Sequence, residues 1–261
     1  MHSYKIIFHI WGKVCIYHNM KVFGFKVNNE KVFIHVVCNV IIFLTIASVV
    51  ALSFFSPTVS VAYMKNDLAI YSGNSNKNNV SLMINVYWGT EYIDQMLEIF
   101  KEKNVKVTFF VGGTWVAKNN EKLAKICTYG HEIGSHGYHH KDHSKLSYEQ
   151  NKDEIYMTHE LVKSLTGLEM NLFAPPSGSY NDTTLNVANN LGYKTILWSK
   201  DTIDWRDKNA TLIEQRATNN VTNGDLILMH PTAETVKALP MIIDALQSKG
   251  YILTTVTENL T

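Results

Sequence analysis

The sequence predicts an α/β protein in which parallel strands form a sheet closed, or nearly closed, into a (β/α) barrel of about seven units, preceded by one transmembrane helix. Through residues 80–261, short apolar runs alternate with amphipathic helical patterns. A helix between successive strands is the connection that parallel strands need. A long segment without charged residues precedes this region and predicts the transmembrane helix. A doubly wound open sheet is the alternative arrangement of the same elements.

The expected elements follow one another without an internal repeat. Strands are expected at residues 80–84, 105–111, 132–134, 171–173, 194–198, 225–230 and 251–254. Helices are expected at residues 93–100, 120–127, 147–167, 182–190, 210–219 and 234–248. The third of these helices has clear ends, because Ser147 and Gln150 form a capping box and Gly167 is a typical terminator. The carboxyl ends of the strands are where such a barrel would hold its chemistry.

Composition indicates a globular protein and argues against nucleic acid as a partner. Of the 261 residues, 46% are hydrophobic and 18% are charged, which is ample material for a core. The first 76 residues are basic, whereas the rest of the chain carries a net charge of −3 and is not suited to neutralising phosphates. The three cysteines are too widely spaced to assemble a disulfide framework or a thiolate metal site in the main domain.

Residues 32–56 form the expected membrane segment. Positions 32–55 are 24 residues without a formal charge, long enough as a helix to cross roughly 30 Å of hydrocarbon. Five lysines precede them, and the positive-inside tendency keeps the basic segment 1–31 in the cytoplasm. We interpret the segment as a single-pass signal anchor with the main domain outside the cell. Cleavage after Ala62, which would give a secreted protein, is the alternative.

A linker is expected between the anchor and the domain. Residues 57–79 become rich in Ser, Asn, Gly and Lys, a composition typical of flexible linkers. The domain is therefore expected to occupy residues 80–261.

Two histidines follow the third expected strand, in the segment Gly-Ser-His136-Gly-Tyr-His-His140. At a spacing of four, with a glycine between them, His136 and His140 can turn their imidazoles toward one point, and zinc is the usual cation for nitrogen ligands. The pair predicts a divalent metal site with zinc as the ion. Surface loops also collect histidines, which is the alternative interpretation. His139 and His143 are expected to be exposed to solvent.

A third histidine, His230, ends the apolar strand Leu226-Ile-Leu-Met-His230. One titratable side chain at the mouth of a barrel suits a general acid. Asp201 and Asp204 follow an earlier strand, and either carboxylate could hold the imidazole in its proton-donating form. Capping of a loop by these aspartates is the alternative.

Five segments stand in a set order: Thr108-Phe-Phe-Val111, Gly130-His-Glu-Ile-Gly-Ser-His136-x-x-x-His140, Phe173-Ala-Pro175-Pro176-Ser-Gly178, Trp198-Ser-Lys-Asp201-Thr-Ile-Asp204-Trp205 and Leu226-Ile-Leu-Met-His230. Together they resemble the polysaccharide deacetylases with a NodB-type homology domain, carbohydrate esterase family 4. The third segment and the turn Asn85-Val-Tyr-Trp-Gly89 are most similar to the branch linked to sporulation in Gram-positive bacteria. The resemblance implies a distorted (β/α) barrel with an Asp-His-His metal site that removes N-acetyl groups from a cell-wall glycan.

The resemblance also implies roles for individual residues. His136 and His140 would bind the metal, and His230 would protonate the departing amine. Asp201 or Asp204 would tune that histidine.

Four further residues match the walls of the family's substrate site. Trp205 and Leu228 would form the apolar walls of the pocket for the acetyl methyl group. Pro175 and Pro176 would form a rigid corner beside the substrate, because two prolines restrict the backbone.

The first motif of the family is degenerate in this chain. That motif ends a strand with Thr-Phe-Asp-Asp-Gly, in which the first aspartate is the base and the second binds the metal. Counted from the strand, these positions are Asn85 and Val86; counted from the glycine, they are Tyr87 and Trp88. Neither count leaves a carboxylate to take a proton or bind a cation. Ala174 also replaces the arginine of the family's Arg-Pro-Pro turn, whose charge would be unpaired without the base.

Two functions from different classes are therefore expected. The first is a membrane-anchored, metal-dependent hydrolase of carbon–nitrogen bonds, a polysaccharide deacetylase acting on N-acetylated peptidoglycan or a chitin-like oligomer. Slow turnover and weak zinc retention are expected, because the base and one metal ligand are missing. Glu91 could replace either one, with an exposed carboxylate at a helix start as the favoured alternative role, and a metal held by two histidines and water is the other conceivable rescue. The second is a catalytically inactive domain that binds glycan or a partner protein in cell-wall or spore assembly.

Overall fold

The computed structural model describes the backbone of residues 21–22, 25–26, 30–55 and 68–261, and the side chains of residues 34–48 and 68–261. The chain divides into two units, residues 1–65 and 66–261. In the first unit, β1 (Lys21–Val22) pairs antiparallel with β2 (Phe25–Lys26), and α2 (Glu30–Phe55) extends over most of the predicted anchor.

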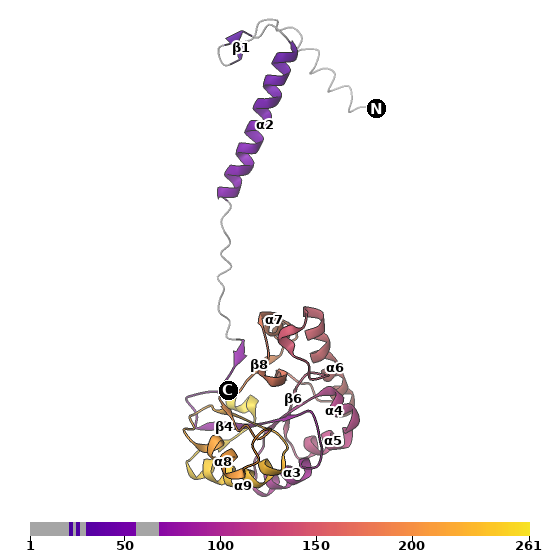
Figure 1. Ribbon diagram of the computed structural model, residues 1–261, viewed down its shortest axis with the longest axis vertical. Coiled ribbons are helices and arrows are strands. Elements are labelled where there is room, and N and C mark those ends of the chain that lie inside the picture. Colours follow the sequence, from indigo (N-terminus) through magenta and orange to yellow (C-terminus); the bar gives the residue numbers. More distant parts are fainter. Residues whose placement is uncertain (1–20, 23–24, 27–29, 56–67) are drawn as a thin grey trace. The chain divides into compact units, whose positions relative to one another are not determined.

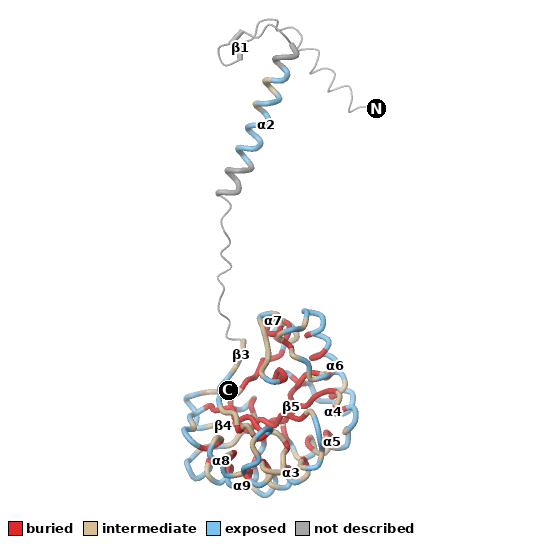
Figure 2. The backbone as a smooth tube through the Cα atoms, in the orientation of Figure 1, coloured by how far each residue is buried: buried red, intermediate tan, exposed pale blue. Residues whose placement is uncertain are grey.

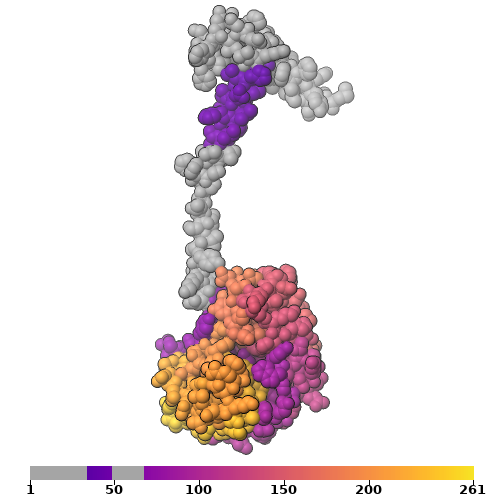
Figure 3. Space-filling view, viewed as in Figure 1, coloured from indigo at the N-terminus to yellow at the C-terminus, as the bar shows by residue number. Residues whose placement is uncertain are grey.

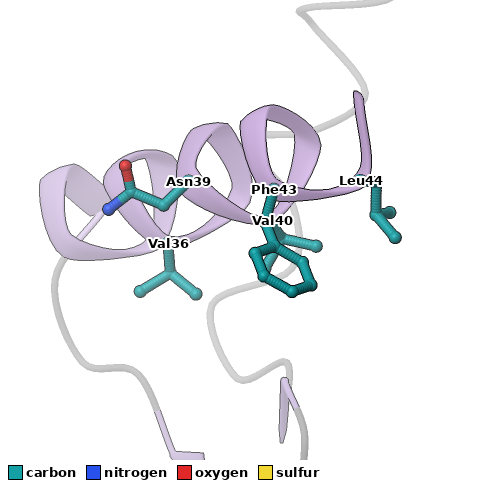
Figure 4. A pocket seen from close by; sticks show the side chains of 5 residues that line it. All are labelled: Val36, Asn39, Val40, Phe43 and Leu44. Carbon is teal, nitrogen blue, oxygen red and sulfur yellow. The ribbon is translucent and has the colours of Figure 1, made fainter. Parts of the chain in front are cut away.

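The side chains described on α2 are mostly apolar and exposed. Figure 4 shows five that line a hollow on this single helix: Val36, Asn39, Val40, Phe43 and Leu44. Within the described ranges, no helix is both long enough and apolar enough to cross a membrane. The anchor at residues 32–56 therefore stays a prediction, and the alternative cleavage site at Ala62 lies outside the described residues.

The second unit is built on one sheet of parallel strands. Their spatial order is β3-β8-β7-β6-β5-β4-β10-β9, with β11 beside β4. The strands are β3 (Ala69–Ile70), β4 (Asn79–Val86), β5 (Thr108–Val111), β6 (Glu132–Ser135), β7 (Leu172–Phe173), β8 (Lys194–Ile196), β9 (Lys200–Asp201), β10 (Leu226–Met229) and β11 (Ile252–Leu253). The sheet curls into a partial barrel. The barrel does not close, because among the described residues no ladder joins its two end strands, β3 and β9.

Helices surround this sheet, as Figure 1 shows. They are α3 (Ile93–Glu102), α4 (Gly113–Lys118), α5 (Asn120–Thr128), α6 (Tyr148–Thr166), α7 (Asp182–Asn190), α8 (Ala210–Thr218), α9 (Ala233–Ser248) and α10 (Val256–Leu260). The predicted ends of the long helix are confirmed: Ser147 and Gln150 form a capping box at the start of α6, and Gly167 follows its end with φ 72°. The predicted alternation of strands and helices is thus confirmed.

The central strand β4 divides the core into two parts, because successive side chains of a strand point to opposite faces. Leu82 and Ile84 belong to a large cluster that includes Phe100 of α3. Met83 lies between them in sequence and belongs to a smaller cluster with Phe110 of β5. Figure 2 shows the buried residues concentrated along these strands. One face of the sheet thus packs against most of the helices, and the other lines the inside of the curl, where Val256 of α10 packs.

Four short elements of this unit were not predicted, namely β3, β9, α4 and α10, and neither were the 3-10 turns at His143–Lys145 and Pro176–Gly178. β3 lies within the expected linker and pairs with β8, so the compact unit begins before residue 80, while residues 57–67 lie outside the described residues. β9 and α4 are also additional. Such short segments contain too little periodicity to be recognised from sequence. In the space-filling view the early part of this unit (purple) lies beside its last third (orange), in agreement with the pairing of β4 and β10 (Figure 3).

Candidate functional site

Four strands of the sheet bring the predicted site residues to one of its edges. Asn85 lies at the carboxyl end of β4, and His136, Ala174 and His230 directly follow β6, β7 and β10. Because all these strands are parallel, their carboxyl ends share one edge. The edge predicted to hold the chemistry is therefore the one that holds these residues.

The backbone after β7 orients His136. Its Nδ1 lies 2.7 Å from the carbonyl oxygen of Ala174, and a carbonyl only accepts, so Nδ1–H is the donor and Nε2 keeps the lone pair. The side chain is buried, and burial together with the nearby charge of His140 lowers its pKa to about 3. His136 is therefore a neutral imidazole with one nitrogen free to accept a proton or bind a cation.

His140 lies next to His136, as the spacing of four predicted. Their ring centroids are 5.0 Å apart. The backbone of His140 is left-handed, with φ 56°, which turns its ring toward the site. Burial lowers the pKa of His140. The loop is held by the buried carboxylate of Glu154, which accepts hydrogen bonds from the backbone N–H and the ring of His139 and pairs with Lys141 at 3.1 Å.

The prediction that His143 is exposed to solvent is wrong. It is fully buried, and its Nδ1–H donates to Oδ1 of Asn151 at 2.7 Å. Its Nε2 has no hydrogen-bond partner among the described residues. His143 is buried because the backbone of Gly137 lies close to its ring: a Cβ placed on Gly137 would lie 2.9 Å from Nε2. His139 is half-exposed but paired with Glu154.

The structure selects Asp204 as the partner of His230. Oδ1 of Asp204 accepts from Nδ1–H of His230 at 2.8 Å, and Oδ2 accepts from its backbone N–H and from the hydroxyl of Thr235, both at 2.6 Å. Asp204 is buried. Asp201 instead accepts from the backbone N–H of Ile203 at 2.8 Å, which is the capping role weighed as the alternative. Nε2 of His230 is the ring nitrogen left available to a substrate.

The end of β4 decides how the degenerate motif aligns. The ladder to β5 runs through Asn85 and Val86, so these two residues occupy the strand end and Tyr87 follows it. Asn85 is buried, and its Oδ1 has no hydrogen-bond partner in the part of the chain that the structure describes. Val86 is fully buried in the large core cluster with Val111. An amide and an isopropyl group thus stand where the family has two carboxylates.

Two aromatic rings follow the strand and lie against the histidines. Tyr87 stacks on His140, with centroids 4.1 Å apart, and Trp88 stacks on His230 at 5.8 Å. Their own rings meet edge to face. The loop is fixed by Trp115 of α4, whose Nε1–H donates to the carbonyl of Gly89 at 2.7 Å. The sequence indicated only that Tyr87 and Trp88 are positions without a carboxylate. Two consecutive aromatic residues just before a glycine were the signal that could have predicted this stacking.

The residues present do not complete a zinc site of the kind the family implies. Within the described ranges, no group of three or more His, Cys, Asp or Glu side chains could hold a metal ion. His136 and His140 supply two nitrogens, but a catalytic zinc site uses three protein ligands. Among the described residues Glu91 does not join the two histidines as a third ligand; its Oε2 accepts from the backbone N–H of Thr90 at 2.9 Å. The predicted metal pair is brought together, whereas its carboxylate partner is missing.

The predicted substrate walls differ in exposure. Leu228 is buried in β10, whereas Trp205 is 56% exposed with the guanidinium of Arg206 6.0 Å from its ring. Pro176 is buried and lines a cavity of about 380 Å³ that also contains His140. Pro175 precedes it and accepts a hydrogen bond from Gly178 at 3.0 Å, which closes the predicted rigid turn. The diproline corner therefore lies beside the histidine pair.

Comparison with known proteins agrees with this arrangement. The polysaccharide deacetylase family model matches residues 72–196. YlxY of Bacillus subtilis, an uncharacterised protein, is 41% identical over 189 residues, which are 72% of this chain and 59% of YlxY, less than two thirds of its length. A peptidoglycan-N-acetylglucosamine deacetylase of Bacillus cereus is 32% identical over 175 residues, or 65% of this chain and 82% of that protein.

Solved structures include an inactive relative. BA3943, a CE4 family pseudoenzyme from Bacillus anthracis, is 38% identical with a TM-score of 0.72, over 74% of this chain and 69% of that one. A BA3943 mutant with restored enzymatic activity is 36% identical, also with a TM-score of 0.72, over 74% of this chain and 71% of that chain. The chain belongs to the polysaccharide deacetylase family, carbohydrate esterase family 4.

Proposed function

We propose that the protein is a membrane-anchored, extracytoplasmic member of this family that binds an N-acetylated glycan of the cell wall and has lost efficient deacetylation. One observation carries the proposal: the histidines and Asp204 are in place, whereas Asn85 and Val86 stand where the two carboxylates belong. The relative from Bacillus cereus acts on peptidoglycan N-acetylglucosamine, which supports peptidoglycan as the polymer. A role in sporulation is the narrower form of the proposal and rests on the sequence resemblance.

The chemistry explains why turnover would be lost. Water must add to the amide carbonyl, after which the C–N bond breaks to give acetate and a free amine. His230 can still give a proton from Nε2 to the amine once it is an imidazolium, the form that Asp204 stabilises by accepting from Nδ1–H. The amide of Asn85 cannot take the proton of the attacking water. A general base is worth ~10²- to 10⁴-fold, so the loss of both carboxylates is expected to reduce acetate release below detection.

A second candidate, slow deacetylation, is favoured by one specific observation. The network of His230, Asp204 and Thr235 is complete and largely buried, as it would be in a working acid. A protein that only bound glycan would have no chemical need for it. This candidate and the first differ only in measurable acetate release.

The test uses the full chain in detergent micelles, with peptidoglycan fragments and chito-oligomers, with and without added zinc. We expect calorimetry to show that the unmodified chain binds these glycans, and we expect no release of acetate. We expect the double variant Asn85→Asp/Val86→Asp to release acetate with zinc, and adding His136→Ala to abolish that release. The restored activity of a BA3943 mutant supports this design. Slow release by the unmodified chain that disappears in His230→Ala would favour the second candidate, and absence of glycan binding would refute the proposal.

Membrane anchoring is a separate part of the proposal. It is supported by the uncharged stretch at 32–55, the lysines before it, and the exposed apolar side chains of α2, among them Ile42 and Phe43. The test is membrane fractionation at alkaline pH together with amino-terminal sequencing of the mature protein. An intact amino terminus in the membrane fraction is expected. A soluble protein beginning at Tyr63 would show cleavage after Ala62 instead.

A further inference from the structure

Trp88 is an exposed aromatic residue in the middle of the site. Its side chain is 49% exposed, whereas the neighbouring His136 and Asn85 are buried. The indole is nearly parallel to the imidazole of His230, with planes 16° apart and centroids separated by 5.8 Å. One region of the indole is thus covered by His230, and a large part of the ring remains open to solvent.

The backbone that carries Trp88 is held in place. Gly89 has φ 68°, a conformation suited to glycine, and its carbonyl accepts from the indole of Trp115. On the other side, Tyr87 meets the indole edge to face at 82° and is itself stacked on His140. The loop therefore presents the indole in one orientation, so that little conformational entropy would be lost when a ligand binds.

The imidazole of His230, which stacks on Trp88, is also held in place. Asp204 accepts hydrogen bonds from both the ring and the backbone of His230, and Thr235 of α9 binds the same carboxylate. A supported, half-exposed indole offers a flat apolar face with an N–H group at its edge. Exposed aromatic residues of this kind are typical anchors of binding sites, since they add large contact area at low entropic cost.

We propose that Trp88 is a sugar-binding residue, on which a pyranose ring of the N-acetylated glycan stacks without the help of a metal ion. This inference rests on the proposed glycan binding and names the residue responsible. The apolar C–H face of a pyranose matches the indole. A cavity lined by His140, the ring on which Tyr87 stacks, also has Ser177 in its lining as a polar partner for hydroxyl and acetamido groups. The aromatic pair at 87–88 thus provides binding directly after the two positions that hold carboxylates in the family.

The experiment measures binding of chitotetraose to the full chain in micelles by calorimetry and by tryptophan fluorescence, in excess EDTA. The variants are Trp88→Ala and Trp88→Phe, with Tyr156→Ala as the matched control, because Tyr156 is 51% exposed on α6 and belongs to no part of the site. We expect roughly tenfold weaker binding in Trp88→Ala, a smaller loss in Trp88→Phe, and no change in the control. Circular dichroism verifies that each variant is folded.

The outcomes separate this inference from the proposed function. Wild-type binding that is unchanged in Trp88→Ala refutes the role of Trp88 and leaves glycan binding intact. Binding that EDTA abolishes refutes the metal-free mode. Absence of wild-type binding both to chitotetraose and to peptidoglycan fragments refutes the proposed function and this inference with it.

Discussion

The phenol ring of Tyr87 lies on the imidazole of His140, with centroids 4.1 Å apart and planes inclined by 24°. This contact joins the first motif to the histidine loop by an aromatic interaction, where the family resemblance implies a shared cation. Val86, next to it, faces the core. The position of the missing metal ligand is therefore filled by a buried valine, and the residue after it packs on a histidine of the predicted metal pair.

Zinc retention is the first consequence. We expect the wild-type chain to lose zinc on dialysis, because two imidazoles without a carboxylate are an incomplete ligand set. The double variant Asn85→Asp/Val86→Asp should retain more, and His136→Ala no more than wild type. Mass spectrometry of the dialysed proteins measures the zinc content of the wild type and both variants and so checks this order of retention. One zinc per chain in the dialysed wild type would contradict it.

The second prediction concerns Asp204. Its replacement by alanine would leave the donors of His230 and Thr235 without their acceptor, so we expect the free energy of unfolding to fall by about 3 kcal/mol. Asp201→Ala is the matched control, since that carboxylate accepts from one backbone N–H of Ile203, and its loss should cost about 1 kcal/mol or less. Urea unfolding measures both. Equal effects would argue against the assignment of Asp204.

A third prediction is a pH dependence of stability. His131 is buried between Phe100 and Phe109, with both ring centroids 5.3 Å away, and its Nδ1 accepts from the backbone N–H of Val107. Burial lowers its pKa from 6.5 to about 4, and the charge of Lys106 adds to the effect. Between these values the unfolded chain binds a proton that the folded chain does not. Stability should therefore fall as the pH falls through this window, by up to about 3 kcal/mol.

The variant His131→Phe isolates this contribution. The variant removes the titrating group. Because the N–H of Val107 loses its acceptor, we expect this lost hydrogen bond to lower the free energy of unfolding by about 1 kcal/mol at every pH. Urea unfolding at a series of pH values should show the wild type as the more stable protein above pH 6.5. As the pH falls toward 4, the wild type loses up to about 3 kcal/mol that the variant does not lose, so the order of the two stabilities should reverse. A difference independent of pH would show that His131 titrates normally.

The fourth prediction tests what holds the histidine loop. Burial alone would raise the pKa of Glu154, but the hydrogen bonds from His139 and the pairing with Lys141 lower it below its usual value. Glu154→Gln should reduce the free energy of unfolding by about 2 kcal/mol, because the charge-assisted bonds of a buried carboxylate are lost. Glu149→Gln on the same helix is the control: its side chain is 72% exposed, and we expect less than about 0.5 kcal/mol. Equal unfolding midpoints in the two variants would contradict the role of Glu154.

Residue types and apolar periodicity were enough to predict the frame of the site and the absence of its two carboxylates. Apolar periodicity identified the main strands, and parallel strands must end at a common edge, so His136 and His230 were placed correctly without coordinates. The loss of both carboxylates follows from residue type alone, because neither way of counting the motif leaves one, whereas the strand end assigned the two positions to Asn85 and Val86. The helix at 148–166 was recognisable because both of its ends have local capping signals.

Which groups pair within that frame depends on the folded arrangement of the loops. Asp201 and Asp204 are three positions apart and chemically alike, and their roles depend on the path of the backbone after β9. The burial of His143 and the stacking of Tyr87 and Trp88 likewise involve residues distant in the chain. Periodicity and spacing describe local geometry, whereas these contacts arise when loops from separate strands pack together, which is why sequence alone could not assign them.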